Sequence, residues 1–282
     1  MYLLLGGLCL AVSSMAQTDT TVKPAPDTTV KPAPASDTLR VGNMIIIKKA
    51  GEKHGGSDTE VKISQRKYKK NPNVSTNWVI LDLGFSNYTD NTDYSSAAAQ
   101  AFAPGSNENW FNLRTGKSVN VNIWLFMQRL NLVNHVLNLK YGIGIELNNY
   151  RYEDNIRYAK NPPSVYKDVI EYSKNKLAAD YVTVPLMLNF NFTPNNEHWK
   201  TFGLSVGMSA GYLYSSRQKY ISDETGKEKT KGNLGLEPFK LSYIAELQLG
   251  PIKLYGSLAS QTMFKDGLDQ KPYNVGLRFS NW

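Results

Sequence analysis

Residues 137–148 read Leu-Asn-Leu-Lys-Tyr-Gly-Ile-Gly-Ile-Glu-Leu-Asn, an unbroken alternation of apolar and polar or small residues. Successive side chains of a β-strand point to opposite faces, so the apolar residues share one face and the others share the second. Lys140 and Glu146 fall on the second face, on either side of two glycines. The stretch predicts a strand with one apolar face and one face of small and charged side chains.

The same alternation recurs in seven further segments between Asn77 and the C-terminus. Segments of about 10–14 residues can cross a bilayer as tilted strands. In hydrocarbon, only helices and closed barrels satisfy every backbone hydrogen bond, and no segment after the N-terminal apolar run reads as a spanning helix. We therefore expect an all-β fold, an eight-stranded antiparallel up-and-down transmembrane β-barrel with an extended N-terminal arm. The expected strands are about Asn77–Tyr88, Lys117–Arg129, Leu137–Asn148, Asp180–Thr193, Trp199–Tyr214, Phe239–Leu249, Ile252–Phe264 and Tyr273–Phe279.

The connections between these segments alternate between long and short. Strands one, three and five are followed by the long connections Thr89–Gly116, Arg151–Ala179 and Ser215–Leu236. Short turns follow strands two, four and six, and a modest loop, Lys265–Lys271, follows strand seven. Outer-membrane barrels have long extracellular loops and short periplasmic turns. We expect the same asymmetry here, with both termini in the periplasm.

Outward aromatic residues collect near both ends of the expected strands. Such belts are typical of side chains at the two membrane–water interfaces. The expected belts are Phe190, Phe192, Phe202 and Phe279 at the periplasmic end, and Tyr212, Tyr214, Phe239 and Tyr273 at the outer end.

Period-two alternation alone does not exclude a soluble barrel of lipocalin type, with its apolar face turned inward around a ligand. The long strands, the asymmetric loops and the many Gly, Ser and Asn residues of the polar face favour the membrane. In the second strand, the alternation places Met127 outward and both Trp124 and Phe126 inward. Pro185 falls on the lumen face of the fourth strand, where we expect a bulge or a bend.

Charged residues also fall on the lumen face. Buried ions must pair, so they predict a structural plug of salt bridges, with a narrow ion-conducting path as the alternative. An eight-stranded barrel is just wide enough for side chains to fill, and we expect no open pore. The expected lumen residues are Asp82, Lys140, Glu146, Lys240, Glu246 and Arg278.

The N-terminal region has three parts. Residues 1–16 resemble a signal peptide, although no basic residue precedes the apolar run. The alternative is a lipoprotein signal, in which Cys9, the single cysteine, would be the lipidated residue. Residues 17–36 repeat a Pro/Thr-rich octapeptide and predict an extended linker. Residues 37–74 form a basic segment with a short apolar run at Met44–Ile47, followed by the barrel at 75–282. The basic stretch Arg40–Lys70 is either a solvated tail or a contact for phosphate-bearing lipid or an envelope protein.

Three stretches resemble the PorT-like family of outer-membrane β-barrels, which share the architecture of the OmpA transmembrane barrel. They are the strand Tyr181–Leu188 with its Val-Pro-Leu core, the glycines at 203, 207 and 211, and the closing Tyr273–Phe279. The similarity covers about Asn77 to Trp282. It implies recognition by the barrel-insertion machinery through Phe279 or Trp282, and it makes a role in envelope secretion or transport conceivable.

No catalytic motif stands out in the sequence. The three histidines fall in the basic tail (His54) or beside the expected periplasmic turns (His135 and His198), away from the outer-end carboxylates. We find no phosphate-binding loop and no metal-ligand spacing, so we expect neither enzyme activity nor a cofactor. The expected partners are outer-membrane lipid, lipopolysaccharide and an envelope protein, and not nucleic acid. The expected function is a structural or interaction barrel, with a secretion-machine component and a narrow channel as alternatives.

Overall fold

The computed structural model describes residues 37–41, 44–48, 72–194 and 200–280. The chain divides into two units, Met1–Lys69 and Lys70–Trp282. In the first unit, β1 (Asp37–Val41) and β2 (Met44–Lys48) pair as an antiparallel hairpin. The expected signal peptide (1–16), the linker (17–36), most of the basic segment, His54, His198 and Trp282 lie outside the described residues.

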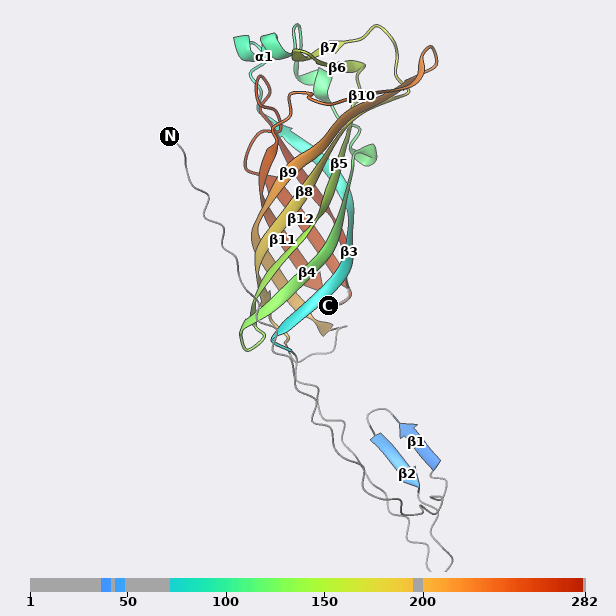
Figure 1. Cartoon of the computed structure of the whole chain (residues 1–282), viewed down its shortest axis with the longest axis vertical. Coiled ribbons are helices and arrows are strands. Elements are labelled where there is room, and N and C mark those ends of the chain that lie inside the picture. The colour runs from blue at the N-terminus through green and yellow to red at the C-terminus, as the bar shows by residue number, and fades with distance from the viewer. Residues whose placement is uncertain (1–36, 42–43, 49–71, 195–199, 281–282) are drawn as a thin grey trace, which may run out of the picture. The chain divides into compact units, whose positions relative to one another are not determined.

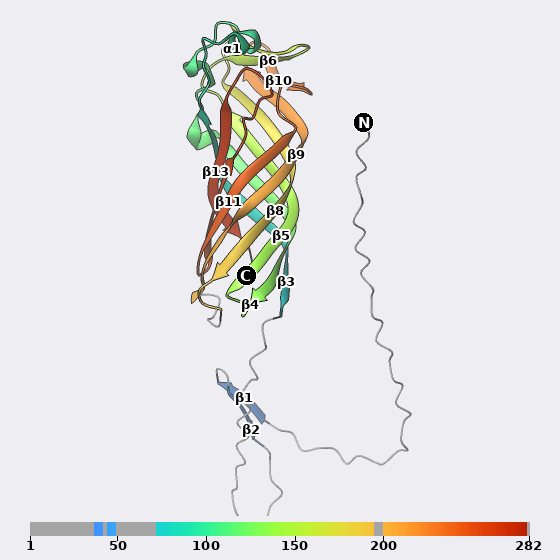
Figure 2. The same ribbon diagram turned by 90° about the vertical axis from the view of Figure 1, so that its left-hand side faces the viewer.

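Eight strands of the second unit close into a ring of antiparallel neighbours (Figures 1 and 2). The ring closes where the last strand pairs with the first, with Arg278 opposite Asp82. This confirms the expected eight-stranded barrel. In order, the strands are β3 (Val74–Asp90), β4 (Val119–Val133), β5 (Leu137–Arg151), β8 (Lys174–Asn191), β9 (Phe202–Ser222), β11 (Phe239–Leu249), β12 (Ile252–Ala259) and β13 (Gln270–Phe279).

Apolar side chains cover the outside of this ring, and polar side chains fill its inside. A soluble lipocalin-type barrel needs the opposite arrangement, so that alternative is wrong. Seven of the eight strands carry exposed apolar residues, and on β5 the outward apolar residues, such as Ile145, are half-buried. Examples from the seven are Phe85, Leu125, Leu186, Val206, Leu241, Leu254 and Leu277. Such an outward apolar face is the surface that hydrocarbon requires of a membrane barrel.

The long connections contain secondary structure of their own, all at one end of the ring (Figure 1). We call this the loop end, and the opposite end, where the short connections lie, the turn end. The strand β10 pairs with the upper part of β9, and β6 pairs with β7. These elements are α1 (Ala97–Phe102), η1 (Glu108–Phe111), η2 (Thr115–Lys117), β6 (Ile156–Lys160), β7 (Pro163–Lys167) and β10 (Gly226–Lys231). Among the described residues, no helix is long and apolar enough to cross a membrane.

The alternation of β4 changes phase near the middle of the strand, and two expectations are wrong beyond that point. The pairing with β5 shifts register between Trp124 and Phe126, so Leu125 is an extra, bulged residue. Beyond it, Met127 is fully buried in the lumen, while Phe126 packs against the exposed Trp78 on the outside. A bulge inserts one residue and so exchanges the two faces of the strand. Since Phe126 and Met127 are both apolar, the sequence pattern does not reveal the change.

Several strands differ in length from the expectation. Both β8 and β9 extend further toward the loop end, to Lys174 and Ser222, whereas β12 stops at Ala259. The lysines of the extensions lie on one face, and the other face is buried against the loop-end connections through polar residues such as Asn175 and Gln218, so the apolar alternation does not continue into them. Pro185 is buried on the lumen side, as expected, but the pairing of β5 with β8 skips it without a register shift. The bulge in the pairing of β8 with β9 instead lies in β9, where Tyr214 is the extra residue opposite Asp180 and Tyr181.

Candidate functional site

An ion-pair network fills the middle of the lumen. Arg278 of β13 lies at its centre and binds the Asp82 carboxylate through two hydrogen bonds, from Nε at 2.7 Å and from a terminal nitrogen at 2.8 Å. Its other terminal nitrogen donates to Glu246 of β11. Lys140 of β5 lies 2.6 Å from the same Glu246, and Lys240 pairs with Glu146. The six side chains predicted for the lumen, three positive and three negative, are all buried and form two ion-paired groups: Asp82, Arg278, Glu246 and Lys140 in one, and Lys240 with Glu146 in the other.

Neutral side chains complete the coordination of the carboxylates. The Trp124 indole donates to Asp82 at 2.7 Å, and the Asn274 and Asn148 amides each donate to Glu146 at 3.1 Å. Other bonds come from Thr183 of β8 to Glu146 and from Lys140 to Ser205 of β9. With Tyr255 of β12 bound to Asn120 of β4, every strand of the ring contributes to this lumen network.

The lumen network leaves little free space. A cavity of about 30 Å³ lies beside Trp124, Glu146 and Arg278. A site of this size holds on the order of two water molecules. Side chains therefore fill this section of the barrel, as its strand number allows.

A second core, which we call the cap, closes the loop end. Buried residues from all four connections at the loop end meet there over the barrel rim. Phe264, fully buried, stacks on Tyr158 at 6.1 Å between ring centroids and packs against Phe102 at 5.4 Å. The Tyr152 and Tyr158 hydroxyls hydrogen-bond to each other at 2.7 Å. The core consists of Phe102, Ala103, Phe111, Tyr150, Tyr152, Ile156, Tyr158, Val165, Leu177, Ala179, Tyr181, Leu234, Leu236, Met263, Phe264 and Leu268.

Comparison with known proteins agrees with this architecture. Residues 59–267 match the family described as outer membrane protein beta-barrel domain. The chain belongs to this family. The barrel domain is accordingly an outer-membrane protein. No curated protein matches the chain.

Two solved structures also resemble the barrel domain. One is the attachment invasion locus protein Ail of Yersinia pestis, solved with the heparin analogue sucrose octasulfate, at 12% identity and a TM-score of 0.29 over 72% of this chain and 98% of that chain. The other is a triple mutant of the Rhodopseudomonas blastica porin, at 10% identity and a TM-score of 0.18 over 74% of this chain and 100% of that chain.

A cluster of charged side chains lies at the side of the cap, between β6, β9 and β10. Arg157 of β6 lies 3.2 Å from Asp168 and 3.4 Å from Glu228 of β10, and its guanidinium stands over the Tyr220 ring at 4.7 Å. Burial opposes ionisation of Asp168, but hydrogen bonds from Tyr172, from the Ile170 amide and from Arg157 together lower its pKa. The cluster therefore ties β6 to β9 and β10 through charge-assisted bonds.

The aromatic residues expected in belts lie near the two ends of the barrel. At the turn end, the Phe192 and Phe202 rings stack at 5.2 Å, and Phe279 is exposed while Phe190 is half-buried. At the loop end, Tyr212 and Phe239 are cross-strand partners with rings 5.2 Å apart. Tyr214 is exposed and Tyr273 half-buried nearby on the same outward face.

The described part of the barrel domain contains no group of three or more side chains that could hold a metal ion. The one described histidine, His135, lies in the turn between β4 and β5, at the opposite end from the cap. Asp90 accepts hydrogen bonds from Tyr94 and Gln270, and Asp154 pairs with Lys167. These two loop-end carboxylates therefore have structural partners.

Sequence reasoning missed the neutral members of the lumen network. Asn120, Asn122, Asn274 and Tyr255 all fall on the polar face of their strands, so the alternation that located the charges could also have located them. The cap core gave no such signal, because its residues lie in connections without a regular period.

Proposed function

We propose that this chain is a non-catalytic outer-membrane barrel that presents its cap outside the cell as an interaction platform. In this proposal the N-terminal arm and the C-terminus face the periplasm. The observation that carries the proposal is the packed core of the cap, to which all four outer connections contribute. A surface built on a buried core keeps its shape, which lowers the entropic cost of binding a partner.

The filled lumen supports an interaction role over the channel alternative. A conducting path needs a continuous water-filled passage, and the lumen network, with ion pairs from four strands and neutral side chains from the other four, occupies that section. The purified barrel in a planar bilayer should show no steady conductance. Conductance comparable to that of a large porin would overturn this part of the proposal.

The orientation is tested by labelling intact cells with a membrane-impermeant maleimide. The only cysteine of the chain is Cys9, so one introduced cysteine gives a specific signal once the signal peptide is removed. Thr225→Cys, in the turn between β9 and β10, should be labelled, and the matched Val136→Cys, in the turn between β4 and β5, should be labelled only after the cells are opened. The reverse pattern would refute the orientation.

We also propose that the chain is a PorT-like barrel, with an accessory role in an envelope secretion or transport machine as the second candidate function. Two of the stretches that resemble this family support the proposal, because Tyr181–Leu188 of β8 and the glycine-rich part of β9 are paired. Pro185 lies opposite Ser209, and Met187 lies opposite Gly207. A Cβ atom on Gly207 would overlap the Leu186 carbonyl oxygen, so β8 and β9 need glycine there. Deletion of residues 37–70 should abolish crosslinks to envelope proteins if the basic arm binds a partner, and should leave them unchanged if it is a passive tail.

A further inference from the structure

A basic surface lies on the outer side wall of the barrel extension, next to the loop end. Here β8, β9 and β10 continue as a paired sheet past the aromatic residues Tyr212 and Tyr214. Residues directly opposite each other in antiparallel strands point to the same face. Four cations form one row across four strands: Arg151, Lys176, Lys219 and Lys229.

The neighbouring rows extend the same surface. One residue pair further toward the tip on this face, Lys174 and Lys227 flank Ile221, and one pair below, Arg217 lies opposite Lys231. The strands are about 4.8 Å apart, so the cations form a two-dimensional array. We define the basic face as Arg151, Lys174, Lys176, Arg217, Lys219, Lys227, Lys229 and Lys231.

The intervening residues establish the direction of this face. The Gln218 amide donates to the Ile156 carbonyl at 2.8 Å, and Tyr220 is buried against Tyr172 of the cap. Because the faces of a strand alternate, Arg217 and Lys219 point away from the cap. The side chains of the basic face therefore point outward from the barrel wall, away from the cap.

Few acidic groups balance the charge of the basic face. Asp180 pairs with Arg217, and Glu228 points to the opposite side of β10, where it binds Tyr220 and Arg157. Above the membrane-spanning part of β9, the ammonium groups of Lys227, Lys174 and Lys229 lower the pKa of Lys219. The lysines thus repel one another, and an anion placed among them would relieve that repulsion.

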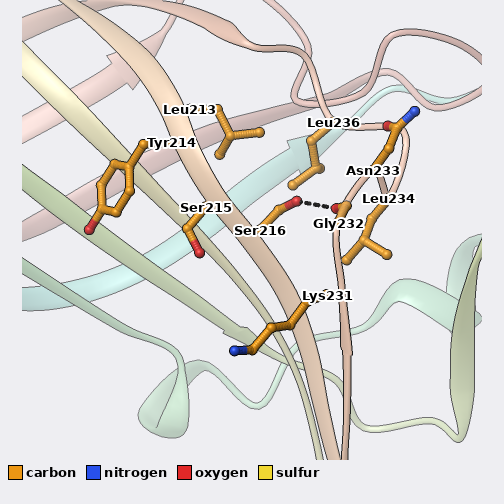
Figure 3. Close-up of a pocket in the computed structure, with 9 residues that line it drawn as sticks. All are labelled: Leu213, Tyr214, Ser215, Ser216, Lys231, Gly232, Asn233, Leu234 and Leu236. Carbon is orange, nitrogen blue, oxygen red and sulfur yellow. Dashed lines mark hydrogen bonds between the residues drawn. The ribbon is translucent and has the colours of Figure 1, made fainter.

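A cleft lies directly below the basic face. It has a volume of about 310 Å³ and lies where β10 separates from β9. Leucines 213, 234 and 236 line its apolar part, and Tyr214 and Lys231 project toward one side of it (Figure 3). An apolar recess beside an interfacial tyrosine, with cations above it, matches the chemistry of a lipid at the level where its acyl chains meet its headgroup.

We propose that the basic face binds the phosphate groups of phosphorylated glycolipid headgroups in the leaflet around the loop end. Its position on the side wall, in line with the apolar strands, brings it against membrane neighbours. The exposed top of the cap would be the place for a soluble polyanion. The choice of the outer leaflet rests on the orientation proposed above. The affinity of the basic face for phosphate groups does not depend on that orientation.

The test compares two triple variants of the full chain, purified in detergent. Lys176→Gln/Lys219→Gln/Lys229→Gln removes the central row, and Lys117→Gln/Lys160→Gln/Lys265→Gln removes the same charge from exposed lysines elsewhere at the loop end. The probes are bisphosphorylated lipid A and its dephosphorylated form. With roughly 1 kcal/mol for each lysine near an anionic surface, the first variant should bind phosphorylated lipid A on the order of 100-fold more weakly. The control variant should bind as the native chain does, and binding should weaken with added salt.

Two outcomes would overturn the proposal: equal losses in the two variants, or equal binding of lipid A with and without phosphate. Tighter binding of a soluble sulfated polysaccharide through the same lysines would assign the face to a different partner, and would also overturn it. These measurements in detergent do not depend on orientation. Reversed maleimide labelling would refute the proposed function while leaving the lipid A result intact.

Discussion

The lumen and the cap have opposite interiors, although they lie in one continuous chain. In the lumen, Asp82, Glu246 and Arg278 are buried among amides and hydroxyls. In the cap, Phe264, Tyr158 and Leu234 are buried among other apolar groups. The barrel wall faces hydrocarbon and places its apolar side chains there, which leaves the polar ones for the inside. The cap stands in water and follows the ordinary rule for a soluble domain.

The two interiors also differ in what holds them together. A buried ion pair gains little over an apolar pair of the same shape, because desolvation offsets the attraction. However, a buried ion pair requires precise geometry, and removing one partner leaves an unpaired buried charge that strongly destabilises the fold. The cap core depends on burial of apolar area, which tolerates small changes in shape. Three substitutions test this contrast.

The largest effect is expected for Arg278→Met. It leaves Asp82 without a cation and removes one of the two cations bound to Glu246, at a cost of about 3–5 kcal/mol in the free energy of unfolding. Urea unfolding in detergent micelles measures this cost. The double variant Arg278→Met/Asp82→Asn should recover part of the stability, since Lys140 still pairs with Glu246. A single variant within 1 kcal/mol of the native chain would contradict the network.

Phe264→Ala should act on the cap and spare the barrel. It leaves a cavity between Tyr158 and Phe102, which costs about 3 kcal/mol locally. Hydrogen exchange should accelerate at the β6 and β7 amides and stay unchanged in β11 and β12. The control Tyr166→Ala removes an exposed aromatic ring of β7 and should change exchange very little. Faster exchange throughout the barrel would show that the two cores are not separable.

The smallest effect is expected for Asp168→Asn, on the side of the cap. The native carboxylate has a lowered pKa, so its contribution to stability is present above its unfolded value near 3.8 and is lost as the pH falls through the folded value. The variant should loosen the cap by no more than about 1 kcal/mol at pH 7. Near-UV circular dichroism during thermal unfolding should show the two chains converging below pH 3.8. A difference that persists in acid would refute the role of the charge.

The same contrast explains what the sequence could predict. Strand number, closure and the six lumen charges follow from the period-two pattern, because each strand separates hydrocarbon from a polar interior. The pairs themselves do not follow, since Asp82 and Arg278 are 196 positions apart and meet only when the ring closes. The cap core was not predicted, because most of its residues lie in the long connections, whose sequences show no regular alternation of apolar and polar residues. The bulge at Leu125 was missed because its flanking residues fit either phase.

The length of β9 has a consequence for how far the protein reaches. Its 21 residues span roughly 70 Å at about 3.3 Å per residue, or roughly 50 Å of height at a tilt near 40°. The apolar band of such barrels is about 25 Å tall, so about half of the strand stands beyond it. In the proposed orientation, the hairpin of β9 and β10 therefore continues beyond the hydrocarbon on the outer side, and a loop inserted at Thr225 would be carried outside the cell by the paired strands themselves.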